Sequence, residues 1–111
     1  MNSKFNVLFL KEAKDFLESI DVISRDKILF NIRKAQLFND PGLFKKLTED
    51  IWEFRTIYNK TYYRLFAFWD KTNKENILVV NTHGLIKKTS KTPKAEIEHA
   101  ETLRKEYFNL K

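Results

Sequence analysis

The sequence predicts one α+β domain over residues 1–111, in which helices pack against a small, mainly antiparallel sheet. A chain of 111 residues suits a single domain with one core. Apolar residues recur at helical spacing near both ends of the chain. Between residues 51 and 82 the chain is instead rich in β-branched and aromatic residues, which favour strands. The expected order of elements is therefore β-α-α-β-β-β-α.

The first third of the chain predicts a strand followed by an αα-hairpin. Residues 5–10 form a short apolar run, which predicts the strand. A helix is expected over residues 11–20, with its apolar face formed by Ala13, Phe16, Leu17 and Ile20. Ser24 is the expected N-cap of a second helix, with its apolar face formed by Ile28, Leu29, Ile32 and Ala35. The turn-forming run Asn39-Asp40-Pro41-Gly42 ends that helix.

The rest of the chain predicts three strands and a terminal helix. Residues 51–58 and 61–69 form a hairpin around a two-residue turn, Asn59-Lys60. After a polar loop over residues 70–76, residues 77–82 are apolar enough for a central strand. Thr92 is the expected N-cap of the last helix, with Pro93 at its first position. One face of this helix is formed by Ile97, Ala100, Leu103, Tyr107 and Leu110.

The composition limits the classes of function. The chain is 42% hydrophobic and 32% charged, as in a globular protein, and its net charge of +6 favours a polyanionic partner. It has no cysteine, which excludes disulfides and thiolate metal sites and fits a reducing cytoplasm. No apolar segment is long enough to span a bilayer. The charge alone does not choose among RNA, DNA, an acidic protein and an anionic membrane. We expect a cytoplasmic protein with no membrane partner.

Two arginines lie inside the predicted hairpin strands. A symmetric register around Asn59-Lys60 pairs Arg55 with Arg64 on one face of the sheet and places Glu53 on that face, opposite Phe66. The other face carries the expected core residues Trp52, Phe54, Tyr58, Tyr63, Leu65 and Trp69. Two like charges opposite each other require a compensating anion. That anion is either Glu53, which gives a salt-bridge patch without a ligand, or a bound phosphate.

Four lysines cluster after the last strand: Lys87, Lys88, Lys91 and Lys94. Near a helix N-terminus such a cluster either binds an anion or remains a solvated charged segment. His83, at the end of the last strand, is either an acid–base group or a hydrogen-bonded structural residue. His99 is an expected surface residue. No metal site is expected, because no HExxH motif is present, and the nucleotide-binding and nucleophile-elbow motifs are absent too.

The order of several short blocks, over about residues 5–110, resembles the HigB-type branch of the RelE/ParE toxin superfamily. The blocks are Ile51-Trp52-Glu53-Phe54-Arg55, Tyr63-Arg64-Leu65-Phe66, His83-Gly84-Leu85-Ile86-Lys87-Lys88-Thr89 and Lys91-Thr92-Pro93, followed by a basic helix with Ile97 and Ala100. Two features depart from the pattern. Leu85 replaces an expected aromatic residue, and Asn81-Thr82 replaces a more apolar strand end.

The resemblance implies the toxin of a bacterial type II toxin–antitoxin module with a RelE-like fold, which cleaves mRNA on the ribosome without metal or cofactor. Its implied partner is a helix-turn-helix antitoxin, and it contacts operator DNA only through the antitoxin complex. Arg64 would stabilise the charge on the phosphate, with Arg55 as a second clamp oriented by Glu53. The other expected site residues are Lys87, Lys88 and His83 for catalysis and Lys91 and Lys94 for RNA binding.

Three other interpretations remain open at this point. A ParE-like branch of the same superfamily poisons DNA gyrase and has no nuclease activity. A basic chain with exposed aromatic residues also suits a non-catalytic nucleic-acid-binding protein. A degenerate toxin would have lost its activity and kept its antitoxin.

Overall fold

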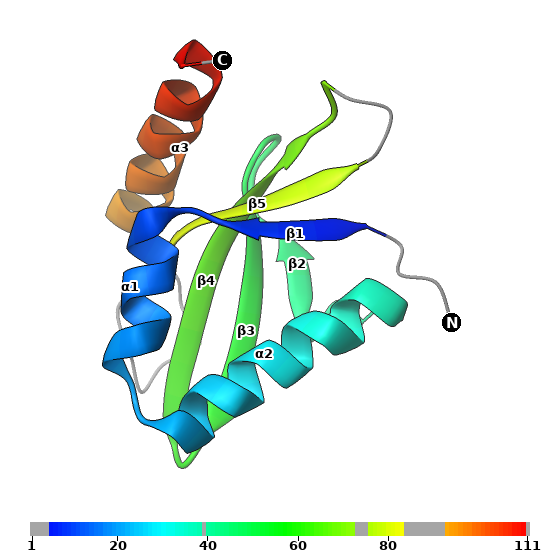
Figure 1. Ribbon diagram of the computed structural model, residues 1–111, viewed down its shortest axis with the longest axis vertical. Coiled ribbons are helices and arrows are strands. Elements are labelled where there is room, and N and C mark those ends of the chain that lie inside the picture. The colour runs from blue at the N-terminus through cyan, green and yellow to red at the C-terminus, as the bar shows by residue number, and fades with distance from the viewer. Residues whose placement is uncertain (1–4, 39, 73–75, 84–92, 111) are drawn as a thin grey trace.

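A mixed sheet forms the centre of the protein, with helices on both of its faces (Figure 1). The computed structural model describes residues 5–38, 40–72, 76–83 and 93–110. These residues form three helices and five strands: β1 (Asn6–Phe9), α1 (Lys11–Ser19), α2 (Val22–Leu37), β2 (Phe44–Lys46), β3 (Trp52–Tyr58), β4 (Thr61–Asp70), β5 (Ile77–His83) and α3 (Lys94–Asn109). The strand order is β1-β5-β4-β3-β2, with β1 and β5 parallel and every other pair antiparallel. The predicted α+β class is confirmed, and β5 is central as expected.

The β3–β4 hairpin has the predicted register. Tyr58 pairs with Thr61, and three steps further from the turn Arg55 pairs with Arg64. The two turn residues, Asn59 and Lys60, have φ angles of 52° and 60°. Two central residues with positive φ are what a two-residue type I′ turn requires, and this turn matches the twist of the strands that it joins.

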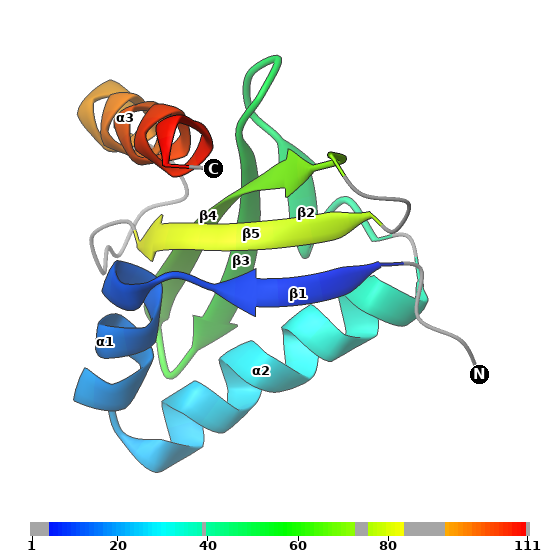
Figure 2. The same cartoon turned by 45° about the horizontal axis from the view of Figure 1, so that its top comes forward.

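Helices α1 and α2 cover one face of the sheet (Figures 1 and 2). Phe16, Leu17, Ile28 and Ile32 from these helices pack against sheet residues that alternate along the strands. Those sheet residues are Phe5, Phe54, Tyr63, Leu65, Ala67, Leu78 and Val80, with Tyr58 and Trp69 partly buried beside them. The aromatic face of the hairpin is therefore the core face, as its sequence predicts.

Helix α3 packs on the opposite face, which is the face of the arginines. Ala100 lies in a second apolar cluster with Ile51, Phe66, Phe68 and Val79, and Ile97, Tyr107 and Phe108 pack around them. Two hydrogen bonds fix α3 to the sheet. The Asn81 side-chain amide donates to the Ala100 carbonyl at 2.7 Å, and the Tyr107 hydroxyl donates to Asp70 Oδ2 at 2.6 Å. Both faces of the sheet thus contain buried apolar residues.

Several local expectations were wrong. Asp21, not Ser24, caps α2: its carboxylate accepts a hydrogen bond from the Ser24 backbone N–H, which lowers the pKa of Asp21. The short strand β2 was not predicted. Asp70 ends β4 instead of starting the loop, and Pro93 takes the cap position of α3 rather than its first turn. Leu110 is exposed. Thr92 lies outside the described residues. None of the described helices is both long enough and apolar enough to span a membrane.

Candidate functional site

A cluster of three charged side chains lies on the α3 face of the hairpin. Arg55 and Arg64 are directly opposite each other in the β3–β4 ladder, and Glu53 is two residues before Arg55 on the same face. The Glu53 carboxylate bridges the two arginines: its Oε1 is hydrogen-bonded to Arg55 Nε, and its Oε2 lies 3.9 Å from Arg64 Nε. The sequence therefore predicted this constellation correctly, because the two-residue turn fixed the register.

The members of this cluster differ greatly in exposure. Glu53 is 0% and Arg64 1% exposed, whereas 27% of the Arg55 side chain is accessible. A buried carboxylate keeps its charge only when positive groups lie beside it, and the two guanidinium groups meet that need. The Arg64 guanidinium also lies 6.0 Å from the centre of the Tyr62 ring on the same strand. An anion from solvent reaches Arg55 without rearrangement, while Arg64 lies beneath the surface.

His83 does not join this cluster. Simple alternation along β5 from Val79 would place His83 on the arginine face. The register between β4 and β5 shifts between Phe66 and Ala67. Ala67 pairs with Val80, whereas Phe66 pairs with Thr82. This bulge turns His83 to the core face, opposite Leu65.

The surroundings of His83 agree with that placement. Its imidazole stacks on Phe16 of α1, with 4.4 Å between the ring centres and 6° between the ring planes. Its Nδ1 atom is buried and has no hydrogen-bond partner among the described residues. Proton transfer between His83 and a phosphate beside Arg55 would therefore have to cross the sheet.

Three of the four lysines of the predicted cluster, Lys87, Lys88 and Lys91, lie outside the described residues. Lys94 is the first residue of α3, and its ammonium group is exposed, 4.0 Å from the Glu98 carboxylate. Because α3 packs on the arginine face, Lys94 belongs to an element on the same side of the sheet as Arg55.

A polar cluster that sequence reasoning missed connects α1, β5 and α3. Glu12 Oε1 accepts a hydrogen bond from Thr82 Oγ1 at 2.6 Å and lies 2.8 Å from His99 Nε2. Burial raises the pKa of Glu12, but these two hydrogen bonds and the charges of His99 and His83 lower it more. The pKa of Glu12 is therefore below its ordinary value. No local sequence signal could have found this cluster, because Glu12 lies 70 positions from Thr82 and 87 positions from His99.

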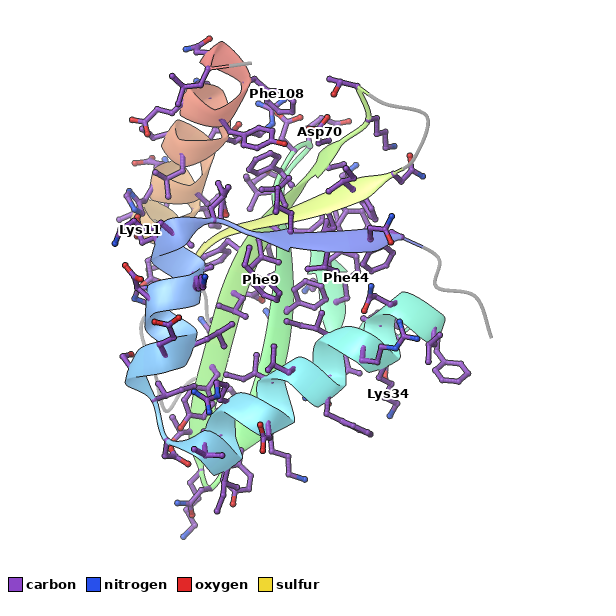
Figure 3. The ribbon with its side chains drawn as sticks, in the orientation of Figure 1. Phe9, Lys11, Lys34, Phe44, Asp70 and Phe108 are labelled. Carbon is purple, nitrogen blue, oxygen red and sulfur yellow. The ribbon has the colours of Figure 1, made fainter. Side chains whose placement is uncertain are left out.

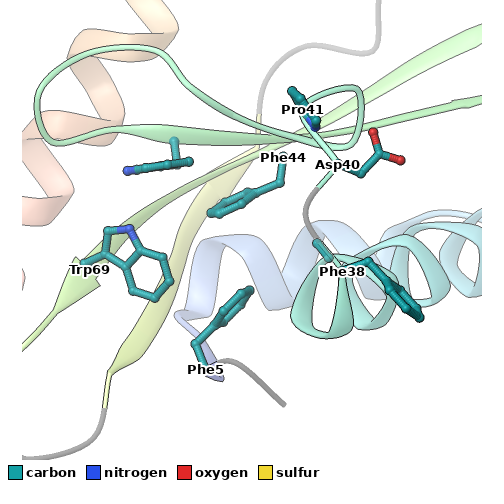
Figure 4. A pocket seen from close by; sticks show the side chains of 8 residues that line it. Phe5, Phe38, Asp40, Pro41, Phe44 and Trp69 are labelled. Atoms are coloured by element: carbon teal, nitrogen blue, oxygen red, sulfur yellow. The ribbon is translucent and has the colours of Figure 1, made fainter. Parts of the chain in front are cut away.

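An apolar pocket of about 350 Å³ lies on the side of the sheet that α1 and α2 cover, away from the arginines (Figure 4). Aromatic side chains from several elements form most of its wall. Its lining residues are Phe5, Ala35, Phe38, Asp40, Pro41, Phe44, Trp52 and Trp69. Phe44 stacks on Trp52 with 4.6 Å between ring centres, so the wall is built from packed rings. Within the described ranges, no three histidine, aspartate or glutamate side chains gather as a metal site would require.

The charged cluster is suited to binding a phosphate. A guanidinium group can donate two parallel hydrogen bonds to phosphate oxygens, and Arg55 is held by Glu53 in a fixed position. The buried Arg64 adds positive charge behind it. The local Glu53 carboxylate offsets part of this charge, so that the cluster is stable without a ligand and retains net positive charge.

Comparison with known families places the chain in one family. Residues 15–105 match a family described as phage-derived protein Gp49-like (DUF891). Comparison with curated proteins found no match, and comparison with solved structures found none either. The three helices and the mostly antiparallel five-stranded sheet of the described residues are consistent with a RelE-like fold. The chain therefore belongs to the Gp49-like family, which is a family of RelE/HigB-type toxins.

Proposed function

We propose that the protein is the toxin of a type II toxin–antitoxin module and that it cleaves mRNA during translation. Membership of a toxin family supports this proposal, and so does the RelE-like fold. The observation that carries it is the cross-strand pair Arg55 and Arg64, anchored by the buried Glu53 on one face of the sheet. The net charge of +6 favours an RNA substrate.

The proposed chemistry is attack by an RNA 2′-OH on the adjacent phosphate. The 2′-OH loses a proton, the phosphate passes through a more negative state, and the 5′-oxygen leaves with a proton. Arg55 contacts the phosphate directly, because its side chain is accessible. Arg64 raises the local positive potential and holds Glu53; for direct contact with phosphate, the side chains that bury it would have to move.

The proton-transfer groups are assigned to the basic segment. Lys87 and Lys88 position the RNA backbone. One of them, with its pKa lowered by neighbouring cations, either accepts the 2′-OH proton as general base or donates a proton to the leaving 5′-oxygen as general acid, and water makes the other transfer. Lys91 and Lys94 bind the RNA backbone further from the cut. His83 is not assigned a proton, because it stacks on Phe16 across the sheet.

The proposed partner is a small antitoxin with a helix-turn-helix domain, encoded next to the toxin. The complex would bind its own operator DNA through the antitoxin. The toxin alone would act on mRNA in the ribosome.

Primer extension on translated mRNA tests the proposal. We expect cuts within codons only while the message is being translated, and Arg55→Ala should abolish them. Lys14→Ala is the matched control, because it removes an exposed positive charge on α1, far along the chain from the hairpin. Cuts that persist in Arg55→Ala would show that the cluster is not the site. DNA breaks without RNA cuts would instead identify a gyrase poison.

A further inference from the structure

Helix α2 is apolar on the side that faces away from the sheet, as well as on the side that faces it. Its buried side packs through Ile28, Ile32 and Ala35. Its outer side exposes several large apolar side chains, which we call the α2 patch: Val22, Ile23, Leu29 and Phe30, with Phe38 just beyond the helix. Phe30 alone is 65% exposed. Contiguous exposed apolar residues on a small domain mark a surface that binds another molecule.

The patch is ordered in rows along the helix. Ile23, Phe30 and Leu37 follow one another at intervals of seven residues, which places them on one line. Val22 and Leu29 form a parallel row on one side of that line. Residues at seven-residue intervals stay on one side of a helix, so each row presents its side chains to a helix that lies alongside α2. A helix of 16 residues is about 24 Å long, enough for a partner helix of several turns.

The charged side chains beside these rows indicate which charge the partner must carry. Lys27 and Lys34 form a third row, also seven residues apart, on the other side of the Phe30 line. Figure 3 shows Lys34 on the side of α2 that is turned away from the sheet. In all, α2 contains four basic residues and one acidic residue. A partner helix must therefore carry carboxylates beside its apolar stripe.

A second copy of this chain does not fit the patch. Two copies would place the lysine rows of two α2 helices against each other, on molecules that each carry a charge of +6. A nucleic acid would satisfy the lysines and leave the aliphatic side chains without a partner. An acidic amphipathic helix satisfies both the rows of apolar residues and the row of lysines.

We propose that the α2 patch is the docking surface for an acidic amphipathic helix of the antitoxin, which rests on the function proposed above. The helix lies along α2, with apolar residues on Phe30 and Ile23 and carboxylates beside Lys27 and Lys34. At the C-terminal end of α2, Phe38 joins the patch to the aromatic pocket, so that a residue at the end of the partner helix can enter it (Figure 4). The docking surface is separate from the arginine face, which lies on the other side of the sheet.

The test uses the small protein encoded by the adjacent gene, purified and titrated against the full-length chain. Phe30→Glu places a carboxylate in the centre of the patch and should weaken binding at least about tenfold. Leu110→Glu is the matched control: Leu110 is 89% exposed and lies just after α3, outside both α2 and the β3–β4 hairpin, so the affinity of this variant for the adjacent-gene protein should not change. Lys34→Glu should weaken binding by a smaller factor and reduce its dependence on salt.

Growth assays separate this proposal from the proposed function. Phe30→Glu should still arrest growth and should no longer be rescued by the adjacent gene, whereas Leu110→Glu should arrest growth and be rescued. If Phe30→Glu and Lys34→Glu bind as tightly as the wild type, the docking proposal is wrong and the nuclease proposal stands.

A free dimer that Phe30→Glu dissociates would assign the patch to self-association and would also overturn the docking proposal. Loss of mRNA cleavage in Phe30→Glu, with binding retained, would assign the patch to the substrate. If Phe30→Glu does not fold by circular dichroism, Lys34→Glu decides alone.

Discussion

Glu53 determines how two arginines can lie opposite each other in one hairpin. Its carboxylate is fully buried and contacts both guanidinium groups, so it neutralises part of a repulsion that would otherwise open the strands. The same contacts orient Arg55, whose side chain reaches the surface. A residue that looks structural thus also sets the position of the proposed phosphate ligand.

Replacing Glu53 should therefore be costly. Glu53→Gln keeps the size of the side chain and removes its charge, which leaves the buried Arg64 without that carboxylate. We expect the free energy of unfolding to fall by about 3 kcal/mol, measured by urea denaturation. Glu49→Gln is the control, because Glu49 is exposed, and it should stay within about 0.5 kcal/mol of the wild type. Equal effects of the two substitutions would contradict the bridging role of Glu53.

Glu12 should make stability depend on pH in the acid range. Its folded pKa is below the ordinary value of 4.5, so its contribution is complete above that value and is lost as the pH falls through the folded pKa. The free energy of unfolding should fall more steeply for the wild type than for Glu12→Gln between about pH 5 and about pH 3. Parallel curves for the two proteins would show that Glu12 does not contribute. Because Glu12 is partly exposed, the effect should be small and sensitive to salt.

The juxtaposition of the site residues was predictable, but their accessibility was not. The turn Asn59-Lys60 fixes the register, and the register brings Arg55 opposite Arg64. The burial of Arg64 depends on packing from other parts of the chain, which no local pattern encodes. His83 could not be placed from sequence either, since one extra residue in β5 moves it to the other face.

In the turn of the β3–β4 hairpin, one residue type is poorly suited to its backbone conformation. Lys60 adopts a φ of 60°, a left-handed conformation that is unfavourable for a residue with a Cβ atom. Asn59, the other turn residue, tolerates this region better because of its short polar side chain. The strand pairing on either side of the turn holds Lys60 in place.

Lys60→Gly should relieve that conflict. Glycine adopts positive φ without steric cost, although it also gains entropy in the unfolded chain. We expect a net stabilisation of about 0.5 kcal/mol by urea denaturation, with the arginine register and activity unchanged. Asn59→Gly should give a smaller gain. A loss of stability in Lys60→Gly would mean that the lysine side chain contributes contacts that outweigh its backbone strain.

The elements that the sequence predicted well are those with strong periodicity. Strands β3 and β4 and helix α1 begin and end within one residue of their expected positions, whereas α2 begins three residues earlier than an N-cap at Ser24 would allow. Strand β2 was missed because it has only three residues, two of them lysines. The apolar face of α3 was predicted, but a helical stripe does not reveal which face of a sheet it covers. The placement of α3 over the arginine side could therefore not be predicted from the sequence.

In the whole molecule, the sheet separates two apolar clusters. The cluster under α1 and α2 is the larger, and the cluster under α3 is closed by polar contacts. One of these joins the Tyr107 hydroxyl to Asp70 at the far end of β4, and another joins Arg104 to Asp50, 3.4 Å apart. Besides its apolar contacts, the attachment of α3 thus depends on polar contacts in the middle and the C-terminal half of the helix.

Tyr107→Phe should loosen α3 without unfolding the sheet. Phenylalanine keeps the ring against Phe68 and removes the hydroxyl that donates to Asp70. We expect a loss of about 1.5 kcal/mol in the free energy of unfolding, because this hydrogen bond involves a carboxylate. Relative to the wild type, the substitution should speed up amide hydrogen exchange in α3 more than in β3 and β4. Uniformly faster exchange would indicate that α3 and the sheet unfold together.

The parallel pairing of β1 with β5 constrains when this protein can fold. β1 is the first strand to be made, yet its partner comes late, because Asn6 pairs with Ile77. Synthesis proceeds from the N-terminus, so β1 has no strand beside it until β5 has left the ribosome. Helix α3 emerges later still. The sheet can therefore close only after β5 has left the ribosome, so every residue between β1 and β5 is made before the parallel pair can form.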